Sequence, residues 1–299
     1  MSALIRNRKA AFGLAIVGLF VLMALFGPFL TSYDPSDYVA IPLEPPSAKH
    51  WFGTTGQGQD VLAQTVAGAR VTLLVGFVTG LVVTAIGALV GMTAGFFRGF
   101  VDDALGLLIN VFLIMPGLPL AVVIAAYLPS GPVTIALVLI VTGWAWNARV
   151  LRAQTLALRE KDFVSAAAVS GERSPRIIFL EILPNMGSLL VSGFIGATVY
   201  AIGAQVGLEF LGLGDVNVVS WGTNLYWATN DAALITGSWW TFVPTGVCVA
   251  LVASALVLVN FAIDEITNPR LRATSGWARR LARYGLRPGL STPVLRPKA

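Results

Sequence analysis

The chain has 299 residues, of which 56% are hydrophobic and only 12% are charged, with a formal net charge of +5 at pH 7. Soluble domains carry about 25% charged residues, so this composition is typical of an integral membrane protein and excludes an ordinary soluble fold. The chain contains one cysteine and one histidine, which exclude a disulfide framework and argue against a zinc site or a histidine-based triad.

Six apolar segments are long enough to cross about 30 Å of hydrocarbon as helices. They cover residues 10–30, 71–95, 104–127, 132–148, 187–207 and 241–263. We therefore predict an all-α integral membrane protein with six transmembrane helices. The first segment follows a basic run but is longer than the apolar part of a signal peptide, and no A-x-A cleavage site follows it, so we interpret it as a retained anchor.

These segments divide the chain into four parts. Residues 1–30 form the N-terminus and the first transmembrane helix, and residues 31–70 form an extracellular loop. Residues 71–265 form a core of five transmembrane helices that includes a long polar loop at 149–186. Residues 266–299 form a basic tail.

Lysine and arginine are distributed unevenly about the predicted spans. If the N-terminus is inside, 18 of the 20 basic residues lie in inside segments, and only Lys49 and Arg70 lie outside. Cytoplasmic segments of membrane proteins carry such an excess, so we predict a multi-pass protein with both termini cytoplasmic. The fourth span ends with Trp144 and Trp146, which are typical of the membrane interface.

The polar loop predicts two short helices. Asp162 is a candidate N-cap for a helix that runs to Ser170, and Gly171 is expected to end it in the left-handed conformation. A second helix should begin at Ser174 and stop before Pro184, because a proline disfavours helix at the residue before it.

The first of these helices has an unusual surface. Ser165, Ala166 and Ala167 leave it almost without side-chain bulk, and basic residues lie on both sides of it. Such a helix could enter a cleft on a soluble partner. It could also pack under its own membrane domain with the basic residues on lipid headgroups, and the spacing alone leaves both interpretations open.

The loop resembles the "EAA" loop of binding-protein-dependent ABC transporter permeases. That loop has E-A-A, three further residues and a glycine, followed at a fixed distance by Leu-Pro. The positions that match are Ala166, Ala167, Gly171, Leu183 and Pro184. Ser165 stands where the family usually has Glu, and Glu181 stands where an Ile is common.

Further motifs are similar to those of dipeptide, oligopeptide and nickel permeases. They are His50-W-F-G-T-T-G-Q-G-Q-D-V-Leu62, Gly68-A-Arg70, Phe210-L-G-L-Gly214, Ser220-W-Gly222 and Asn268-P-R-Leu271. Thr55 and Gln59 replace the usual Asp and Arg of the first motif. The pattern most resembles the second, "C"-type, permease subunit.

The resemblance implies a fold of the type I ABC importer permease kind and a function as one permease subunit of an ATP-driven importer in the plasma (inner) membrane of a prokaryote. The solute would be a di- or oligopeptide, or alternatively nickel or another small solute. The partners would be a second permease that forms a heterodimer, two ATPase subunits that bind ATP and Mg²⁺, an extracellular solute-binding protein and membrane lipids. The chain itself would bind no cofactor or metal and have no catalytic residues, and it lacks the phosphate-binding motif G-x-x-x-x-G-K-[ST].

Two sets of site residues follow. The family's coupling helix, which would sit in a groove of an ATPase subunit, maps onto Asp162, Phe163, Ser165, Ala166, Ala167, Gly171 and Glu172. Candidate contacts with the binding protein or the outer vestibule come from the two longest outside segments, where aromatic residues at the membrane interface are the alternative interpretation. These candidates are Trp51, Asp60, Glu209, Asp215 and Trp221.

Two other functional classes are alternatives to this interpretation. A secondary carrier usually places ionisable residues at mid-membrane, and the centres of the predicted spans contain none. A membrane scaffold would act without ATPase subunits. The basic tail is expected to lie on anionic headgroups, as an amphipathic helix or as an unstructured segment, and not to bind nucleic acid, since the predicted topology already requires a basic inner flank.

Overall fold

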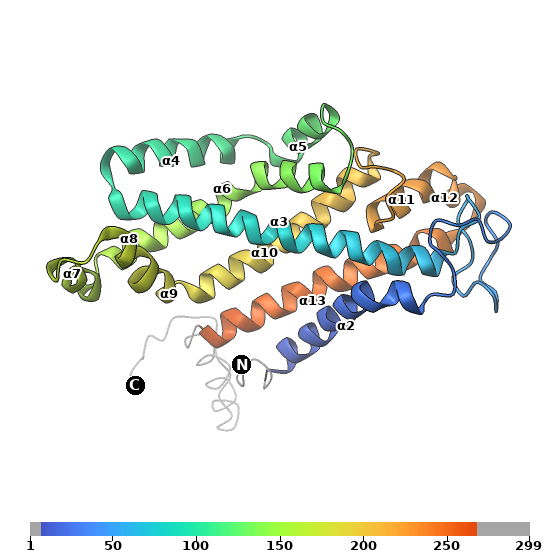
Figure 1. The fold of residues 1–299 in the computed structure, drawn as a ribbon, viewed down its shortest axis with the longest axis horizontal. Coiled ribbons are helices and arrows are strands. Elements are labelled where there is room, and N and C mark those ends of the chain that lie inside the picture. Colours follow the sequence, from blue (N-terminus) through green and yellow to red (C-terminus); the bar gives the residue numbers. More distant parts are fainter. Residues whose placement is uncertain (1–6, 268–299) are drawn as a thin grey trace, which may run out of the picture.

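The computed structural model describes residues 7–267, which form an elongated bundle of helices with no strand among them (Figure 1). The predicted basic tail lies almost entirely outside this range. Within residues 7–267, five helices are long and apolar enough to cross a membrane. They are α2 (Arg8–Leu30), α3 (Val61–Phe97), α6 (Pro132–Arg159), α10 (Gly187–Phe210) and α13 (Val243–Thr267).

The sixth predicted span is broken. Helices α4 (Gly99–Ile114) and α5 (Gly117–Ala126) meet at an angle of 83°, and the bundle has six spans if this pair counts as one. The prediction of one continuous helix over 104–127 was therefore wrong. Met115 is extended, with ψ 133, because the ring of Pro116 disfavours the helical conformation at the preceding residue.

Two helices extend well beyond their predicted limits. Helix α3 begins ten residues earlier than expected, because the side chain of Asp60 caps it by accepting a hydrogen bond from the Ala63 N–H at 2.8 Å. Its 37 residues span about 55 Å, longer than the hydrocarbon core. Helix α6 continues past its apolar part as far as Arg159. Of the two tryptophans expected at the membrane interface, Trp144 lies inside the bundle, 7% exposed, and Trp146 is 64% exposed.

Small residues bring the long helices close together. A Cβ at Gly91 of α3 would lie 2.4 Å from the carbonyl oxygen of Ala148 on α6, and one at Gly87 would lie 2.7 Å from the Cβ of Asn147. A Cβ at Gly80 would lie 2.3 Å from Thr198 Oγ1 on α10. Glycine therefore allows the backbones of α3, α6 and α10 to approach closely, as is common in membrane bundles.

Different segments lie at the two ends of the bundle. One end carries α7 (Asp162–Val169), α8 (Ser174–Arg176) and α9 (Leu183–Asn185), beside the turn from α3 to α4 (Figure 1). The opposite end carries the segment between α2 and α3 together with α11 (Trp221–Asn230), α12 (Ala233–Thr236) and the 3₁₀ turn η2 (Trp239–Thr241). The start of α2 and the end of α13 lie on the same side, where Lys9 Nζ is 3.8 Å from Glu265 Oε2.

The second helix of the polar loop does not stop before Pro184. It continues from α8 through a π-helix, η1 (Ile177–Ile182), into α9, so that prediction was wrong. In the π register the Leu183 N–H donates to the Ile178 carbonyl, five residues back. The wider turn accommodates a proline ring that would clash with the preceding turn of an α-helix.

Candidate functional site

Helix α7 is a short exposed helix anchored at one point. Val164 is buried, 4% exposed, in a cluster with Ile177, Ile178 and Ile182 of the following segment. Asp162, Phe163, Ser165 and Ala166 are exposed, as are Gly171 and Glu172 beyond the helix. Ala167 is half-buried against the same cluster. The helix therefore exposes the small side chains of Ser165 and Ala166 above an apolar anchor, with Phe163 and Val169 exposed toward its two ends.

The end of α7 has the geometry predicted from the sequence. Gly171 has φ +81, in the left-handed region. Its N–H donates to the Ala168 carbonyl at 3.1 Å, and the Glu172 N–H donates to the Ala167 carbonyl at 3.2 Å. These two bonds form a Schellman motif, which satisfies carbonyls that the helix end would leave without partners.

Charged side chains border the α7 end of the bundle. Arg176 Nε lies 2.8 Å from Glu172 Oε2, so the Glu172 carboxylate is directed toward the helix that follows. Arg98, at the turn from α3 to α4, pairs with Glu160, just before α7. Arg159 lies over the ring of Phe96, 5.6 Å from its centroid. The base of α7 is thus tied to the ends of α3 and α6.

At the opposite end of the bundle, three of the five predicted outer contacts are buried. Asp60, Glu209 and Trp221 are at most 3% exposed. Their burial corrects the prediction that they form part of a docking surface, because a partner cannot reach them. Trp51 is 71% exposed and Asp215 is half-buried, so these two remain accessible.

The buried residues connect the outer segments to one another. Asp60 Oδ2 lies 2.9 Å from His50 Nδ1, and both side chains are buried, so His50 has a local structural role here. Glu209 accepts hydrogen bonds from Ser220 Oγ at 2.5 Å and Gln205 Nε2 at 3.0 Å. Trp221 Nε1 donates to the Thr65 carbonyl at 2.9 Å. Sequence motifs that lie far apart therefore meet at one place.

A loop carboxylate also lies within this outer layer. Asp231, which follows α11, lies next to Gly56, where an added Cβ would come within 2.2 Å of its carboxylate. Burial raises the pKa of Asp231 above its ordinary value. Its contact with the segment before α3 shows that this segment packs closely against α11 and does not extend freely from the bundle.

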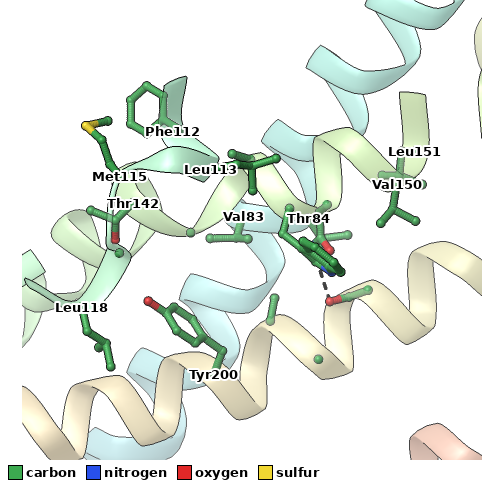
Figure 2. A pocket seen from close by; sticks show the side chains of 18 of the residues that line it. Val83, Thr84, Phe112, Leu113, Met115, Leu118, Thr142, Val150, Leu151 and Tyr200 are labelled. Atoms are coloured by element: carbon green, nitrogen blue, oxygen red, sulfur yellow. Dashed lines mark hydrogen bonds between the residues drawn. The ribbon is translucent and has the colours of Figure 1, made fainter. Parts of the chain in front are cut away.

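A cavity of about 710 Å³ opens where α4 breaks into α5. Its walls come from α3, α4, α5, α6 and α10, with Asn260 contributed by α13, and Tyr200 projects from α10 toward Leu118 and Thr142 (Figure 2). Among residues 7–267, no lining side chain is charged, and apart from the indole of Trp146 the polar side chains carry hydroxyls or amides. They are Thr84, Thr142, Asn147, Ser192, Tyr200 and Asn260.

None of these cavity residues was among the predicted site residues. Asn147 lies on α6, and its Nδ2 donates to Thr84 Oγ1 on α3 at 3.1 Å and to the Gly193 carbonyl on α10 at 3.4 Å. It joins three helices beside the cavity. The available signal was an amide side chain between apolar residues, close to the end of the predicted span over 132–148.

These features define a multi-pass membrane protein with an uncharged cavity inside the bundle and a small exposed helix at one end. Residues 87–273 match the family described as "Binding-protein-dependent transport system inner membrane component". Residues 1–46 match "N-terminal TM domain of oligopeptide transport permease C". The chain therefore belongs to the binding-protein-dependent transport system inner membrane component family, and it is a permease subunit of an ABC importer, not an enzyme.

Curated relatives match most of the chain. The oligopeptide transport system permease protein OppC of Bacillus subtilis (strain 168) is 32% identical over 270 residues, covering 89% of this chain and 87% of the relative. OppC of Mycobacterium tuberculosis (strain ATCC 25618 / H37Rv) is 34% identical over 288 residues, with 95% of each chain covered. The dipeptide transport system permease protein DppC of Bacillus subtilis is 34% identical over 275 residues, covering 89% and 83%.

Proposed function

We propose that this permease takes di- or oligopeptides into the cell and forms half of their pathway together with a second, different permease chain. The observation that carries the substrate class is the similarity along nearly the whole chain to permeases named for oligopeptide and dipeptide transport. ATP and Mg²⁺ bind to two partner ATPase subunits, and an extracellular binding protein delivers the peptide.

The proposed contact with the ATPase is α7. Its small, exposed face suits insertion into a groove, while buried Val164 holds the helix to the membrane domain. Asp162, Phe163, Ser165, Ala166, Gly171 and Glu172 form the accessible part of the predicted coupling site. Ala167 supports this surface from below, because it packs against the Val164 cluster.

The α7 end of the bundle is proposed to face the cytoplasm, with both chain termini on the same side. Arg98, Arg152, Arg159, Lys161 and Arg173 all belong to the elements at that end, whereas Lys49 and Arg70 belong to the opposite end. The positive-inside rule favours this orientation. The binding protein then meets the end that carries Trp51 and Asp215.

The cavity beside the α4–α5 break is proposed as this chain's part of the pathway. Hydroxyl and amide groups can form hydrogen bonds with a peptide backbone, and the absence of charge among the lining residues of the described chain places no restriction on the charge of peptide side chains. A nickel pathway would more plausibly present carboxylate, histidine or cysteine ligands.

Uptake of labelled peptides tests the substrate class. A strain that lacks this chain should lose uptake of labelled tri- to pentapeptides and recover it when the chain is restored. Nickel uptake, measured in the same two strains, should be unchanged. Normal peptide uptake with defective nickel uptake in the deletion strain would refute the peptide assignment.

A bulky substitution on α7 tests the ATPase contact. Ala166→Arg should abolish peptide uptake, because the side chain fills the space that the groove wall occupies, whereas Ala166→Ser at the same exposed site should transport normally. Both variants should reach the membrane at wild-type levels. Ala166 is a cleaner probe than Ala167, whose substitution would also disturb the Val164 cluster. Wild-type uptake by Ala166→Arg would exclude α7 as the contact.

A further inference from the structure

Helix α4 forms one wall of the cavity but is attached to the bundle at few points. Of its 16 residues only Ile109 is buried, in a cluster with Trp144, Ala145 and Ala148 of α6. Its last turns contribute Phe112 and Leu113 to the cavity. Beyond them the chain turns by 83° into α5. Phe112 and Leu113 pack against the same cluster, so the apolar packing that this cluster gives α4 is concentrated in the second half of the helix.

Helix α6 connects the cavity directly to α7. It runs without a break from Pro132 to Arg159, and α7 begins at Asp162. Thr142 and Asn147 of α6 line the cavity. Because an unbroken helix is stiff along its axis, a displacement of α7 moves this wall of the cavity directly.

One ion pair joins α4 to α6 between the cavity and α7. Arg152 of α6 donates through both Nε and Nη2 to the two carboxylate oxygens of Asp102 on α4, with Nη2 and Oδ2 2.8 Å apart. Asp102 precedes Leu113 by about 16 Å along α4, and Arg152 precedes Arg159 by about 10 Å along α6.

The geometry of this pair distinguishes it from the other arginine pairs at the same end. The side chain of Asp102 is 15% exposed and that of Arg152 is 33% exposed. In the Arg98–Glu160 pair, the side chain of Arg98 is 46% exposed and that of Glu160 is 64% exposed. A two-point arginine–carboxylate contact fixes orientation as well as distance. The more shielded pair is also weakened less by water and salt.

We propose that Asp102 and Arg152 are positioning residues for transport, which clamp α4 to α6 so that both cavity walls move together when α7 is displaced. This inference rests on the proposed function, since it assumes that α7 receives the motion of an ATPase subunit. Without the clamp, α6 still follows α7, but α4 lags behind because only the Ile109 contact and its neighbours hold it. ATP hydrolysis then opens and closes the cavity incompletely.

The test uses the full complex in proteoliposomes and measures peptide imported per ATP hydrolysed. Asp102→Asn and Arg152→Gln should each lower this ratio at least about fivefold, the lower end of the usual range of coupling between sites. The double variant should be no worse than the more affected single variant, because both remove the same contact. Asp103→Asn, at the exposed neighbouring position, is the matched control and should keep the wild-type ratio.

Several outcomes overturn the proposal. A wild-type ratio in either single variant does so, as do losses that multiply in the double variant. A fall in thermal midpoint and yield with an unchanged ratio would show that the pair only stabilises the fold. Arg152→Lys keeps the charge but not the two-point contact. Arg152→Lys should therefore also lower the ratio, and it replaces Asp102→Asn in the test if the complex with Asp102→Asn does not assemble. A wild-type ratio for Arg152→Lys would refute the clamp.

The same measurements separate this inference from the proposed function. If the wild-type complex imports no peptide, the proposed function fails. If the wild-type complex imports peptide and the Asp102→Asn complex imports as much per ATP, only the clamp fails.

Discussion

At the scale of single residues, the turn after α7 depends on backbone conformation and not on space. Gly171 has φ +81, yet no heavy atom lies within 4 Å of the position that a Cβ would take. Any side chain would fit, but an L-residue is strained in this region of φ and ψ. The glycine therefore acts by permitting the two hydrogen bonds that end the helix.

Two glycine substitutions should have opposite effects. Gly171→Ala should destabilise the end of α7 by about 1 kcal/mol, the cost of a left-handed alanine. Gly203→Ala, inside α10 with equally open space, should be neutral or stabilising because alanine favours helix. Peptide uptake should fall for Gly171→Ala and not for Gly203→Ala, and thermal unfolding in detergent should show the sign of each change. Equal midpoints for the two variants would contradict this account.

Two tryptophans show how similar residues differ in role. Trp221 is fully buried, packs edge-on against Phe20 with ring centroids 5.7 Å apart, and donates a hydrogen bond to Thr65. Trp51 is largely exposed at the same end of the molecule. Both were candidate docking residues in the sequence, where neither neighbour nor burial is visible.

At the scale of elements, the contact between α3 and α6 determines the frame that surrounds the cavity. Gly87, Gly91 and Gly95 lie against successive turns of α6, and a Cβ at each would come within 3 Å of an α6 atom. In a bilayer the hydrophobic effect does not drive helices together, so close backbone packing has to supply the attraction. This contact keeps α3 and α6 as one unit.

A single methyl group in this contact should be costly. In Gly91→Ala the new Cβ meets the carbonyl oxygen of Ala148, which is backbone and cannot rotate away, so we expect about 1–3 kcal/mol of destabilisation from overpacking. Gly18→Ala on α2, where no atom lies within 4 Å, is the control and should keep or raise the midpoint of thermal unfolding in detergent. If Gly91→Ala is as stable as Gly18→Ala, the two helices are not packed as described.

At the scale of the whole molecule, the two ends should be accessible from opposite sides of the membrane. Arg173→Cys, at the α7 end, and Ala48→Cys, at the other end, are both at exposed positions. In a chain carrying Cys248→Ala, a membrane-impermeant thiol reagent should label Ala48→Cys in intact cells and Arg173→Cys only after the membrane is opened. The reverse pattern would invert the proposed orientation.

Local chemistry determined much of this protein in advance. Hydropathy located the apolar segments, the basic residues favoured one orientation, and Gly171 predicted the turn that ends α7. The prediction of Asp162 as the N-cap was wrong, because Lys161 takes that position and Asp162 is the first residue of α7, with no side-chain capping bond. Each of these properties depends on residues that are close in the chain, because helix ends and membrane insertion respond to short stretches of sequence. Short motifs, in the EAA-like loop and from His50 to Arg70, were also sufficient to indicate the family.

Only the tertiary structure decided which residues meet. The Asp102–Arg152 pair joins positions 50 residues apart, and the bond from Trp221 to Thr65 joins positions 156 residues apart. Hydropathy could not show the 83° bend at Pro116, because both sides of it are equally apolar. Burial of Asp60, Glu209 and Trp221, and the uncharged cavity beside Asn147, likewise arise from packing between distant helices, which no local pattern encodes.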